Sequence, residues 1–428
     1  MCRIWVSGRP EVGDTKGVVG MPGFRVGPYT RGRVLERLER LAHQGLDVGT
    51  FLSSAGAELA RAVRFDPDAL PNPTWVTLDP ASLLATSLIE GGQQGWQCEM
   101  APHEWAEYEY ASQALGNRIN DVVRHPRGMQ TATEVAHANP DRADEYREAL
   151  AYIGAEHEVL VALQAAGGTH WGALYLTREP GRPDFSPEEL DFLRLAAPHL
   201  AEGIRRGLLL GDASEPDGPD APAVVVLGPE LGPEHDPESH TPGAEQWLAD
   251  LPAPTVGTTP PAVLAVAQTV LHQPVEHRRT VSTRVRSEDR GWVMVHGQAL
   301  AGSGDPRVAI TIQPIGPDRI TSLLMAAYGL TKREEEVTRH VLRGRSTAEI
   351  ADALAISPYT VQDHLKKVFD KTSVSSRREL TGRVFSRHYE PRVDDNLERL
   401  ERDRPIRGGP FPQEPQRADS AHHAGLYR

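Results

Sequence analysis

The apolar positions near the beginning of the chain recur with the period of an α-helix. In residues 33–44, RVLERLERLAHQ, they place Val34, Leu35, Leu38 and Leu41 on one face. Residues 47–63, DVGTFLSSAGAELARAV, repeat this pattern. The first folded unit is therefore predicted to open with two amphipathic helices.

The pattern changes to alternation after these helices. A short strand is predicted in TWVTLD, and two more around a Gly-Gly turn in EHEVLVALQAAGGTHWGALYLTRE. An amphipathic helix follows, with Ser186 as its N-cap, Pro187 as its first residue and Glu189 completing a capping box. These elements predict a mixed α/β sensory-type domain at 29–210.

The end of this unit carries a resemblance to a known family. The segment THWGALYLTREPGRPDFSPEELDFLRLAAPHLAEGIRRGLL, with a strand, a turn, Phe-Ser and a closing helix, resembles the end of a GAF domain. GAF domains are antiparallel sheets flanked by helices, and they often enclose a small ligand. The resemblance implies a GAF-like sensor at 29–210 for an unknown small molecule. Four tryptophans are weak candidates for lining its cavity, and core packing is the better interpretation of any one of them: Trp75, Trp96, Trp105 and Trp171.

A second α+β unit is predicted at 222–316. PAVVVLG reads as a strand, TPGAEQWLADL as a short helix and PPAVLAVAQTVLHQ as a longer helix, and three alternating strands follow in RTVSTRVRSEDRGWVMVHGQAL and RVAITIQPI. This order resembles a PAS-like fold. Residues 211–221, GDASEPDGPDA, are predicted to be an acidic linker. A solvated spacer is the simpler interpretation of this linker, and inhibitory docking on a basic domain is the alternative.

Four helix-start signals crowd into the segment after this unit. Only Ala355 and Ile356 separate the second predicted helix from the third, and such a tight connection is typical of a helix-turn-helix. The starts are three capping boxes and one N-cap followed by proline: Thr331 with Glu334, Ser346 with Glu349, Ser376 with Glu379, and Ser357 with Pro358.

The third of these helices is amphipathic. Its inner stripe is formed by Val361, Leu365, Val368 and Phe369, while amide, carboxylate and ammonium side chains are left on the outside. Such an outer stripe can reach base edges and phosphates in a major groove. The segment is therefore predicted to bind double-stranded DNA.

The whole of this segment resembles one family. LTKREEEVTRHVLRGRSTAEIADALAISPYTVQDHLKKVFDKTSVSSRREL resembles the LuxR-type helix-turn-helix from end to end. The resemblance implies that the third helix enters the major groove and that the fourth often supports dimerisation. Among the residues that it implies for DNA binding, three would face the bases: Gln362, Asp363 and Lys366. The others would position the helix or contact the DNA backbone: Ser346, Thr360, Val361, His364, Lys367 and Lys371.

Three positions depart from the pattern of this family. Gln362 stands where lysine is common, Asp363 stands where a small or hydroxyl residue is usual, and Thr372 replaces a common leucine. The Asp363 carboxylate would be repelled by phosphates, but it can accept a hydrogen bond from cytosine N4. A sequence-specific reader with modest non-specific affinity is the resulting hypothesis.

The distribution of charge agrees with this assignment. The chain of 428 residues has a formal net charge of −13. Residues 330–385 carry eleven Lys or Arg against eight Asp or Glu, a net of +3, so the remainder carries −16. Because the positive charge is confined to the predicted DNA-binding segment, an acidic protein can still bind DNA there.

Other classes of protein find little support. No run of 18 apolar residues and no signal peptide are recognised, so a cytoplasmic protein without membrane contact is expected. Cys2 and Cys98 cannot build a disulfide framework, and a redox-sensing Cys98 is the less favoured alternative to a packed thiol. No catalytic motif is found, so neither an enzyme nor a cofactor is predicted. Three histidines lack metal-ligand spacing, and no metal site is expected: His103, His157 and His170.

The sequence thus predicts a multidomain transcription regulator. It comprises a GAF-like α+β sensor, a PAS-like α+β middle domain and an all-α four-helix LuxR-type domain at 326–386, and it is expected to form a homodimer on DNA. Residues 1–28 are expected to be a flexible arm, with Met21 as an alternative start, and residues 387–428 a disordered tail. The rival hypothesis is a signalling protein or enzyme whose last domain binds a protein instead of DNA.

Overall fold

The structure is a computed structural model, and it describes most of the chain between residues 27 and 402. The predicted arm up to residue 26, the linker at 211–221 and the tail from 403 lie outside the described residues. The described ranges are 27–65, 73–90, 101–111, 117–209, 222–229, 231, 237–253, 259–273, 279–287, 291–301, 305–315, 325, 328–372, 374–388, 397 and 401–402.

The first domain is built on a five-stranded antiparallel sheet with the order β2-β1-β5-β4-β3. The predicted strand at 74 and the predicted hairpin are confirmed, whereas β2, β3 and the helices between residues 102 and 152 were not resolved by pattern. The strands are β1 (Thr74–Leu78), β2 (Ala85–Glu90), β3 (Met129–Thr131), β4 (His157–Gln164) and β5 (His170–Arg178).

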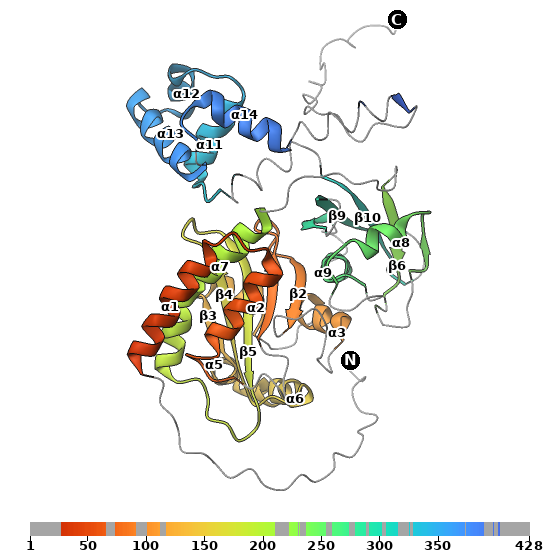
Figure 1. The fold of residues 1–428 in the computed structure, drawn as a ribbon. Helices are drawn as coiled ribbons and strands as arrows, with labels where there is room; N and C mark the ends of the chain where they lie inside the picture. The colour runs from red at the N-terminus through yellow and green to blue at the C-terminus, as the bar shows by residue number, and fades with distance from the viewer. Residues whose placement is uncertain are drawn as a thin grey trace, which may run out of the picture.

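Three helices cover one face of this sheet (Figure 1). They are α1 (Pro28–Ala42), α2 (Val48–Leu59) and α7 (Pro187–Leu209), and they bury a continuous apolar cluster against alternate residues of the strands. Gly203 of α7 lies against Phe51 of α2, and a Cβ at residue 203 would come within 1.9 Å of the phenyl ring. Glycine is therefore required there for the two helices to pack so closely.

Shorter helices lie on the opposite face of the sheet. This face receives the alternate strand residues, such as Leu160 and Tyr175, together with Trp105 and Ile119. Its helices are α3 (Pro102–Ala106), the π-helical turn η1 (Glu107–Ala111), α4 (Ile119–Arg124), α5 (Ala132–Ala138), the 3₁₀ turn η2 (Pro140–Arg142) and α6 (Ala143–Tyr152).

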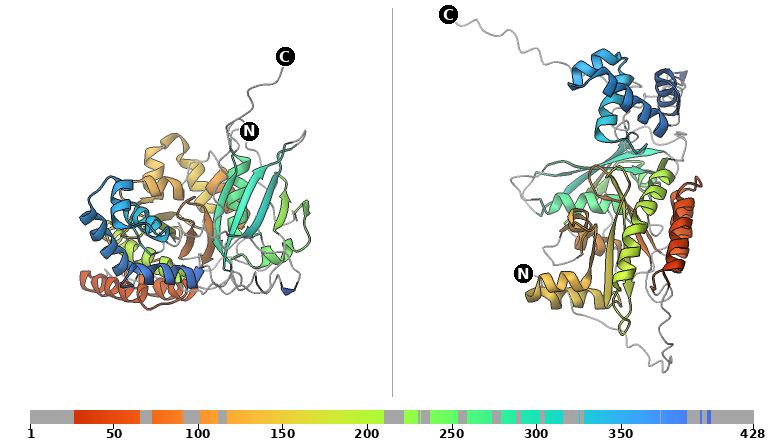
Figure 2. Two further views of the ribbon diagram at one scale, coloured as in Figure 1. Left: turned by 90° about the horizontal axis from the view of Figure 1, so that it is seen from above. Right: turned by 90° about the vertical axis from the view of Figure 1, so that its left-hand side faces the viewer.

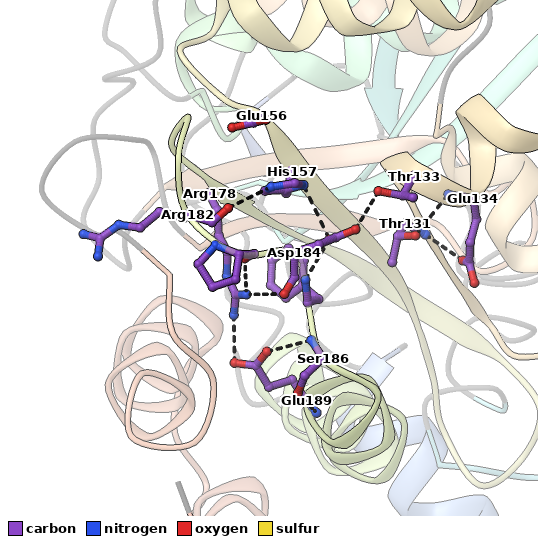
Figure 3. Close-up of polar contacts among 12 residues, drawn as sticks. Thr131, Thr133, Glu134, Glu156, His157, Arg178, Arg182, Asp184, Ser186 and Glu189 are labelled. Carbon is purple, nitrogen blue, oxygen red and sulfur yellow. Dashed lines mark hydrogen bonds and ion pairs between the residues drawn. The ribbon is translucent and has the colours of Figure 1, made fainter. Parts of the chain in front are cut away.

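A buried arginine fixes the loop between β5 and α7. Arg178 donates to the carbonyl oxygens of Pro183 and Asp184, and its Nη2 lies 2.7 Å from Glu189 Oε1 (Figure 3). Glu189 also accepts from the amide of Ser186, so the predicted capping box is confirmed. His157 of β4 lies beside Asp184 in the same view, and its ring also contacts the carbonyl oxygen of Arg182, so it ties the strand to the loop in a structural role.

The second domain repeats the topology of the first. Its antiparallel sheet has the order β7-β6-β10-β9-β8, which in chain order is the same 2-1-5-4-3 arrangement. The predicted strands and helices of this unit are confirmed, and β7 is added. The elements are β6 (Ala223–Leu227), β7 (Ser239–His240), α8 (Ala244–Ala249), α9 (Pro261–Leu271), β8 (Val281–Arg286), β9 (Trp292–Ala299) and β10 (Val308–Pro314).

Helix α9 lies between the two domains (Figure 1). It packs on β8, β9 and β10 of its own domain, and it also contacts β2, α3 and η1 of the first. Leu264 belongs to the apolar cluster of the first domain, and Leu84 of the first domain belongs to the cluster of the second. Because α9 is buried almost all round, it lacks the polar face of an ordinary surface helix.

A buried ion pair joins the two domains beside α9. Arg284 of β8 places Nη2 2.5 Å and Nε 3.0 Å from Asp79 Oδ1, and the backbone amide of Arg284 donates to Oδ2. Both side chains are at least nine-tenths buried. Ser82 donates to Asp79 and contacts Thr283 across the same boundary.

Four helices form the C-terminal domain, as predicted: α11 (Lys332–Leu342), α12 (Thr347–Leu354), α13 (Pro358–Thr372) and α14 (Arg377–His388). They gather at one end of the molecule (Figures 1 and 2). The capping boxes at Thr331 and Ser346 are confirmed, and Ser357 caps α13 by accepting from the amide of Thr360. At α14 the Ser376 hydroxyl accepts from the amide of Glu379, but the carboxylate of Glu379 accepts from the amide of Ser375.

We predict that Asp79→Ala will destabilise the protein by about 3–5 kcal/mol, because Arg284 would lose its buried carboxylate partner. Urea unfolding followed by tryptophan fluorescence will measure this. The control is Asp144→Ala, which removes an exposed ion pair with Arg147 and should change stability by less than about 1 kcal/mol. Equal effects of the two changes would contradict a structural role for the interdomain pair.

We predict that Ala355→Gly will stabilise the C-terminal domain by up to about 1 kcal/mol. Ala355 ends α12 in the left-handed region at φ 52°, where a Cβ is strained and glycine is not. The control Ala353→Gly, at an exposed position inside α12, should instead cost about 1 kcal/mol. The midpoint temperatures of thermal unfolding of the two variants should shift in opposite directions.

Candidate functional site

The outer face of α13 is the first candidate site. Gln362, Asp363, Lys366 and Lys367 are all exposed on it. Val361 is not available for DNA contact, because its side chain is fully buried in the core of the four helices. Its inclusion among the DNA-binding candidates was therefore wrong, and the inner-stripe prediction for it is confirmed.

Gln362 is held by a short polar network. Its Nε2 donates to Thr347 Oγ1 over 3.2 Å, and Arg377 Nη2 donates to the same hydroxyl over 2.8 Å. Arg377 also donates to the carbonyl oxygen of Arg345. Side chains from α12, α13 and α14 thereby meet beside the predicted base-reading position.

Two of the other candidates pair with each other. Lys367 Nζ lies 2.8 Å from Asp363 Oδ2, one helical turn away. This hydrogen bond and the charge of Lys367 lower the pKa of Asp363, and Asp363 in turn raises the pKa of Lys367. Since both side chains are exposed, the pair can separate at little cost when a nucleic acid approaches.

Lys371 points toward the start of α11. Its Nζ lies 2.7 Å from Glu334 Oε2 and 2.9 Å from the carbonyl oxygen of Gly329. Burial opposes the charge of Glu334, but its hydrogen bonds to Lys371 and to the Thr331 amide outweigh that and lower its pKa. The ammonium group of Lys371 therefore fastens α13 to α11.

The remaining candidates occupy helix starts and the flank of α13. The Ser346 hydroxyl accepts from the Glu349 amide and donates to the Glu349 carboxylate. Thr360 is half-buried, and its hydroxyl contacts Ser357. His364 is half-buried, and its Nδ1 has no hydrogen-bond partner within the described part of the chain.

Sequence reasoning missed three residues of this face. Thr347 and Arg377 form the network around Gln362, and Tyr359 at the start of α13 is 84% exposed. Arg377 is the arginine of the closing Val-x-Ser-Arg-x-Glu-Leu element, which gave a signal for it. No pattern marked Thr347, because its role depends on the crossing of α12 with α13.

The described tryptophans that were proposed for a ligand cavity lie on both faces of the sheet. Trp75 and Trp171 are fully buried in the cluster under α1, α2 and α7, while Trp105 lies in the cluster on the other face of the sheet. Trp96 lies outside the described residues. Because the sheet lies between Trp105 and the other two, the three described tryptophans do not line one common cavity.

A second candidate site lies on the face of the sheet that carries η1. Glu109 of η1 is buried, and its carboxylate accepts from the Ile119 amide over 2.8 Å and from the Tyr175 hydroxyl over 3.1 Å. Burial is the main cause that raises the pKa of Glu109 to about 8. The sequence EYEY gave no sign of this, because charged residues usually lie on the surface.

Glu158 of β4 is the second buried carboxylate on this face. The Tyr146 hydroxyl donates to its Oε1 over 2.9 Å, and the side chain of Asn117 also lies against it. Burial raises the pKa of Glu158 to about 7, although the Tyr146 and Asn117 contacts oppose this. Burial, and after it the charges of both carboxylates, raise the pKa values of Tyr108 and Tyr175, so the two acids and the tyrosines form one cluster.

Metal and membrane sites find no support in the described structure. Among the residues that it covers, no three His, Cys, Asp or Glu side chains are grouped so as to hold a metal ion. No helix in this part of the chain is both long and apolar enough to span a bilayer.

Comparison with known families identifies the C-terminal domain. Residues 329–384 match the family described as "Bacterial regulatory proteins, luxR family". The four helices at this place are therefore a LuxR-type helix-turn-helix domain, a class of DNA-binding domain found in transcription regulators. No curated protein matches the chain.

The solved structures that are similar to this chain have low TM-scores. A phycoerythrobilin-bound GAF domain from a cyanobacterial phytochrome has 14% identity and a TM-score of 0.25, with 42% of this chain and 96% of that chain covered. A Vibrio cholera VqmA–ligand–DNA complex has 16% identity and a TM-score of 0.20, with 40% and 84% covered. The E. coli DhaR(N)–DhaL complex has 12% identity and a TM-score of 0.19, with 67% and 88% covered.

We predict that the thermal stability of the protein will fall between pH 6 and pH 8.5. Burial raises the folded-state pKa values of Glu109 and Glu158 to about 8 and about 7, well above the ordinary value of 4.5. The stability that they contribute is fully present below the unfolded pKa and is lost as the pH rises through the folded pKa values. Differential scanning calorimetry over this range will measure the fall.

The variant Glu109→Gln should show a shallower fall, because its amide cannot ionise. Glu148→Gln, at an exposed position on α6, is the matched control, and its thermal stability should fall with pH as steeply as that of the unchanged protein. A pH profile of Glu109→Gln identical to that of the unchanged protein would show that Glu109 does not titrate in this range.

Proposed function

We propose that this protein is a sequence-specific DNA-binding transcription regulator whose N-terminal domains sense a small ligand or a partner. The observation that carries the proposal is the LuxR-type domain at 329–384, with an exposed polar face on α13. A helix of 15 residues is about 22 Å long, and a major groove about 12 Å wide admits it lengthwise. We propose no enzymatic activity and no cofactor.

The exposed side chains of α13 supply the chemistry of base recognition. The amide of Gln362 can pair with adenine N6 and N7, and the ammonium of Lys366 with guanine O6 or N7. The carboxylate of Asp363 can accept from cytosine N4 once Lys367 turns toward a phosphate. Arg377 and Tyr359 flank this face and are proposed to contact the sugar-phosphate backbone of the DNA.

The sensor would act on DNA binding through packed contacts. A Cβ at Gly329, just before α11, would lie 3.9 Å from the guanidinium of Arg205 on α7, and Gly167 of the β4–β5 turn approaches the same glycine. Arg286 of the second domain donates to the carbonyl oxygen of Leu208, also on α7. We propose that a ligand shifts the population of sensor conformations and so the placement of two reading helices in a homodimer.

The domain limits follow as part of this proposal. They are a sensor at 29–210, a linker at 211–221, a middle domain at 222–316 and a DNA-binding domain at 326–386. Helix α14 continues to His388, two residues beyond the last of these limits.

We predict that selection from random duplex DNA will enrich a palindromic site with the intact protein, because two copies related by a two-fold axis read equivalent half-sites. Gln362→Ala should lose about fivefold or more in affinity for that site and keep the slope of affinity against salt, since the amide carries no charge. Fluorescence anisotropy at several salt concentrations will measure both quantities.

The matched test for base reading is Asp363→Ala against Asp352→Ala, an exposed change of the same charge on α12. Asp363→Ala should relax the preference at one base pair, whereas Asp352→Ala should leave the enriched sequence unchanged. Absence of any enriched sequence would overturn the proposed function in favour of a domain that binds protein.

A further inference from the structure

The proposed function leaves the buried acidic cluster of the first domain without a role. We define this cluster as Glu109, Asn117 and Glu158, together with the tyrosines around them. It lies between the sheet and η1, and each of these three side chains is at least nine-tenths buried. Two carboxylates in one apolar core are costly, and apolar residues of similar shape would pack there at lower cost.

The Asn117 side chain provides an independent sign that a partner is missing. Its Nδ2 donates to the carbonyl oxygen of Gln130 over 2.8 Å, and this bond fixes which way the amide points. Its Oδ1 is buried, and it accepts no hydrogen bond from the described residues. An unsatisfied buried acceptor is destabilising, and a hydrogen-bond donor from a ligand would remove that cost.

The hydrogen-bonding balance of the cluster favours a donor. Each oxygen of an ionised carboxylate can accept about two hydrogen bonds; Glu109 accepts from the Ile119 amide and the Tyr175 hydroxyl, and Glu158 from the Tyr146 hydroxyl, with the Asn117 side chain also against it. Arg118 attracts Glu109, and its Nε donates to Asp121. When ionised, the two carboxylates can accept more hydrogen bonds than the contacts named above supply, and a ligand with N–H donors would favour that ionised form.

The backbone at this place has an unusual geometry. Glu109 lies in a five-residue π-helical turn, EYEYA, which follows α3 directly. Single π-turns are rare and occur frequently at functional sites. The same turn carries Tyr108 and Tyr110, and Tyr110 accepts from the amide of Ala85 at the start of β2.

We propose that the acidic cluster binds an organic cation that carries N–H donors, such as a primary ammonium or a guanidinium group. The cation would donate to Glu109, Glu158 and the Oδ1 of Asn117, and the faces of the surrounding tyrosines would add cation–π attraction. Its role as a signal rests on the proposed function, whereas its binding does not.

The position of the cluster connects it to the rest of the sensor. Helix α9 contacts η1 directly, and Tyr110 packs against the apolar clusters of both domains. A cation that moves Glu109 of η1 would therefore act on α9, the helix that the two domains share.

Isothermal titration calorimetry of the full-length chain with agmatine and with phenethylamine tests the proposal. We expect at least one of these amines to bind and to release protons, because a bound cation favours the ionised carboxylates. Affinity should rise about tenfold or more from pH 6.5 to pH 8.5, as the pKa values of Glu109 and Glu158 are passed. The neutral analogue 2-phenylethanol should not show this dependence.

The variant Glu109→Gln should bind the amine about tenfold or more weakly, while Glu148→Gln on the surface of α6 should bind it unchanged. The amide resembles the protonated acid in shape, and circular dichroism will establish that the variant is folded. If neither amine binds at millimolar concentration, or if Glu109→Gln binds like the unchanged protein, the proposal is overturned.

The two proposals fail separately. Calorimetry contains no DNA, so a failure to bind amines leaves the selected operator and its loss in Gln362→Ala untouched. Amine binding without any enriched DNA sequence would instead support the acidic cluster and overturn the regulator.

Discussion

The burial of α9 between two sheets is the constraint on which the sensor part of this protein depends. An isolated sheet-and-helix domain presents the outer face of its helix to water, but α9 has almost no polar face to present. Leu264 enters the core of the first domain and Leu84 enters the core of the second. Separation of the domains would expose both residues, so the two domains are expected to move as one body.

The polar groups at this boundary follow from the same burial. Because water is excluded there, Asp79 needs the guanidinium of Arg284, and that requirement fixes the register between β8 and the loop after β1. Glu109 and Glu158 have only hydroxyl, amide and backbone partners in the hydrogen bonds shown, so their burial is expressed as raised pKa values. The cost of these acids is understandable if they serve a function that apolar residues cannot serve.

Local patterns predicted much of the fold. The helix starts at Ser186, Thr331 and Ser346 were visible because a cap and its glutamate are only three residues apart. The strands β4 and β5 were visible because a glycine turn separates two apolar runs. Strands β2 and β3 and the turn η1 were not, since they are short and their pairing or packing depends on distant segments.

The sequence by itself determined the class of the C-terminal domain, because caps, helix period and motif all lie within one short stretch of chain. It also indicated which side of α13 faces outward, although it counted Val361 both in the buried stripe and among the DNA-binding residues. Only the tertiary structure decided that Gln362 meets Thr347 and Arg377, that α9 is shared, and that Glu109 and Glu158 are buried in one cluster. These are contacts between residues far apart in the chain, and a side chain's neighbours and solvent exposure there depend on packing rather than on local sequence.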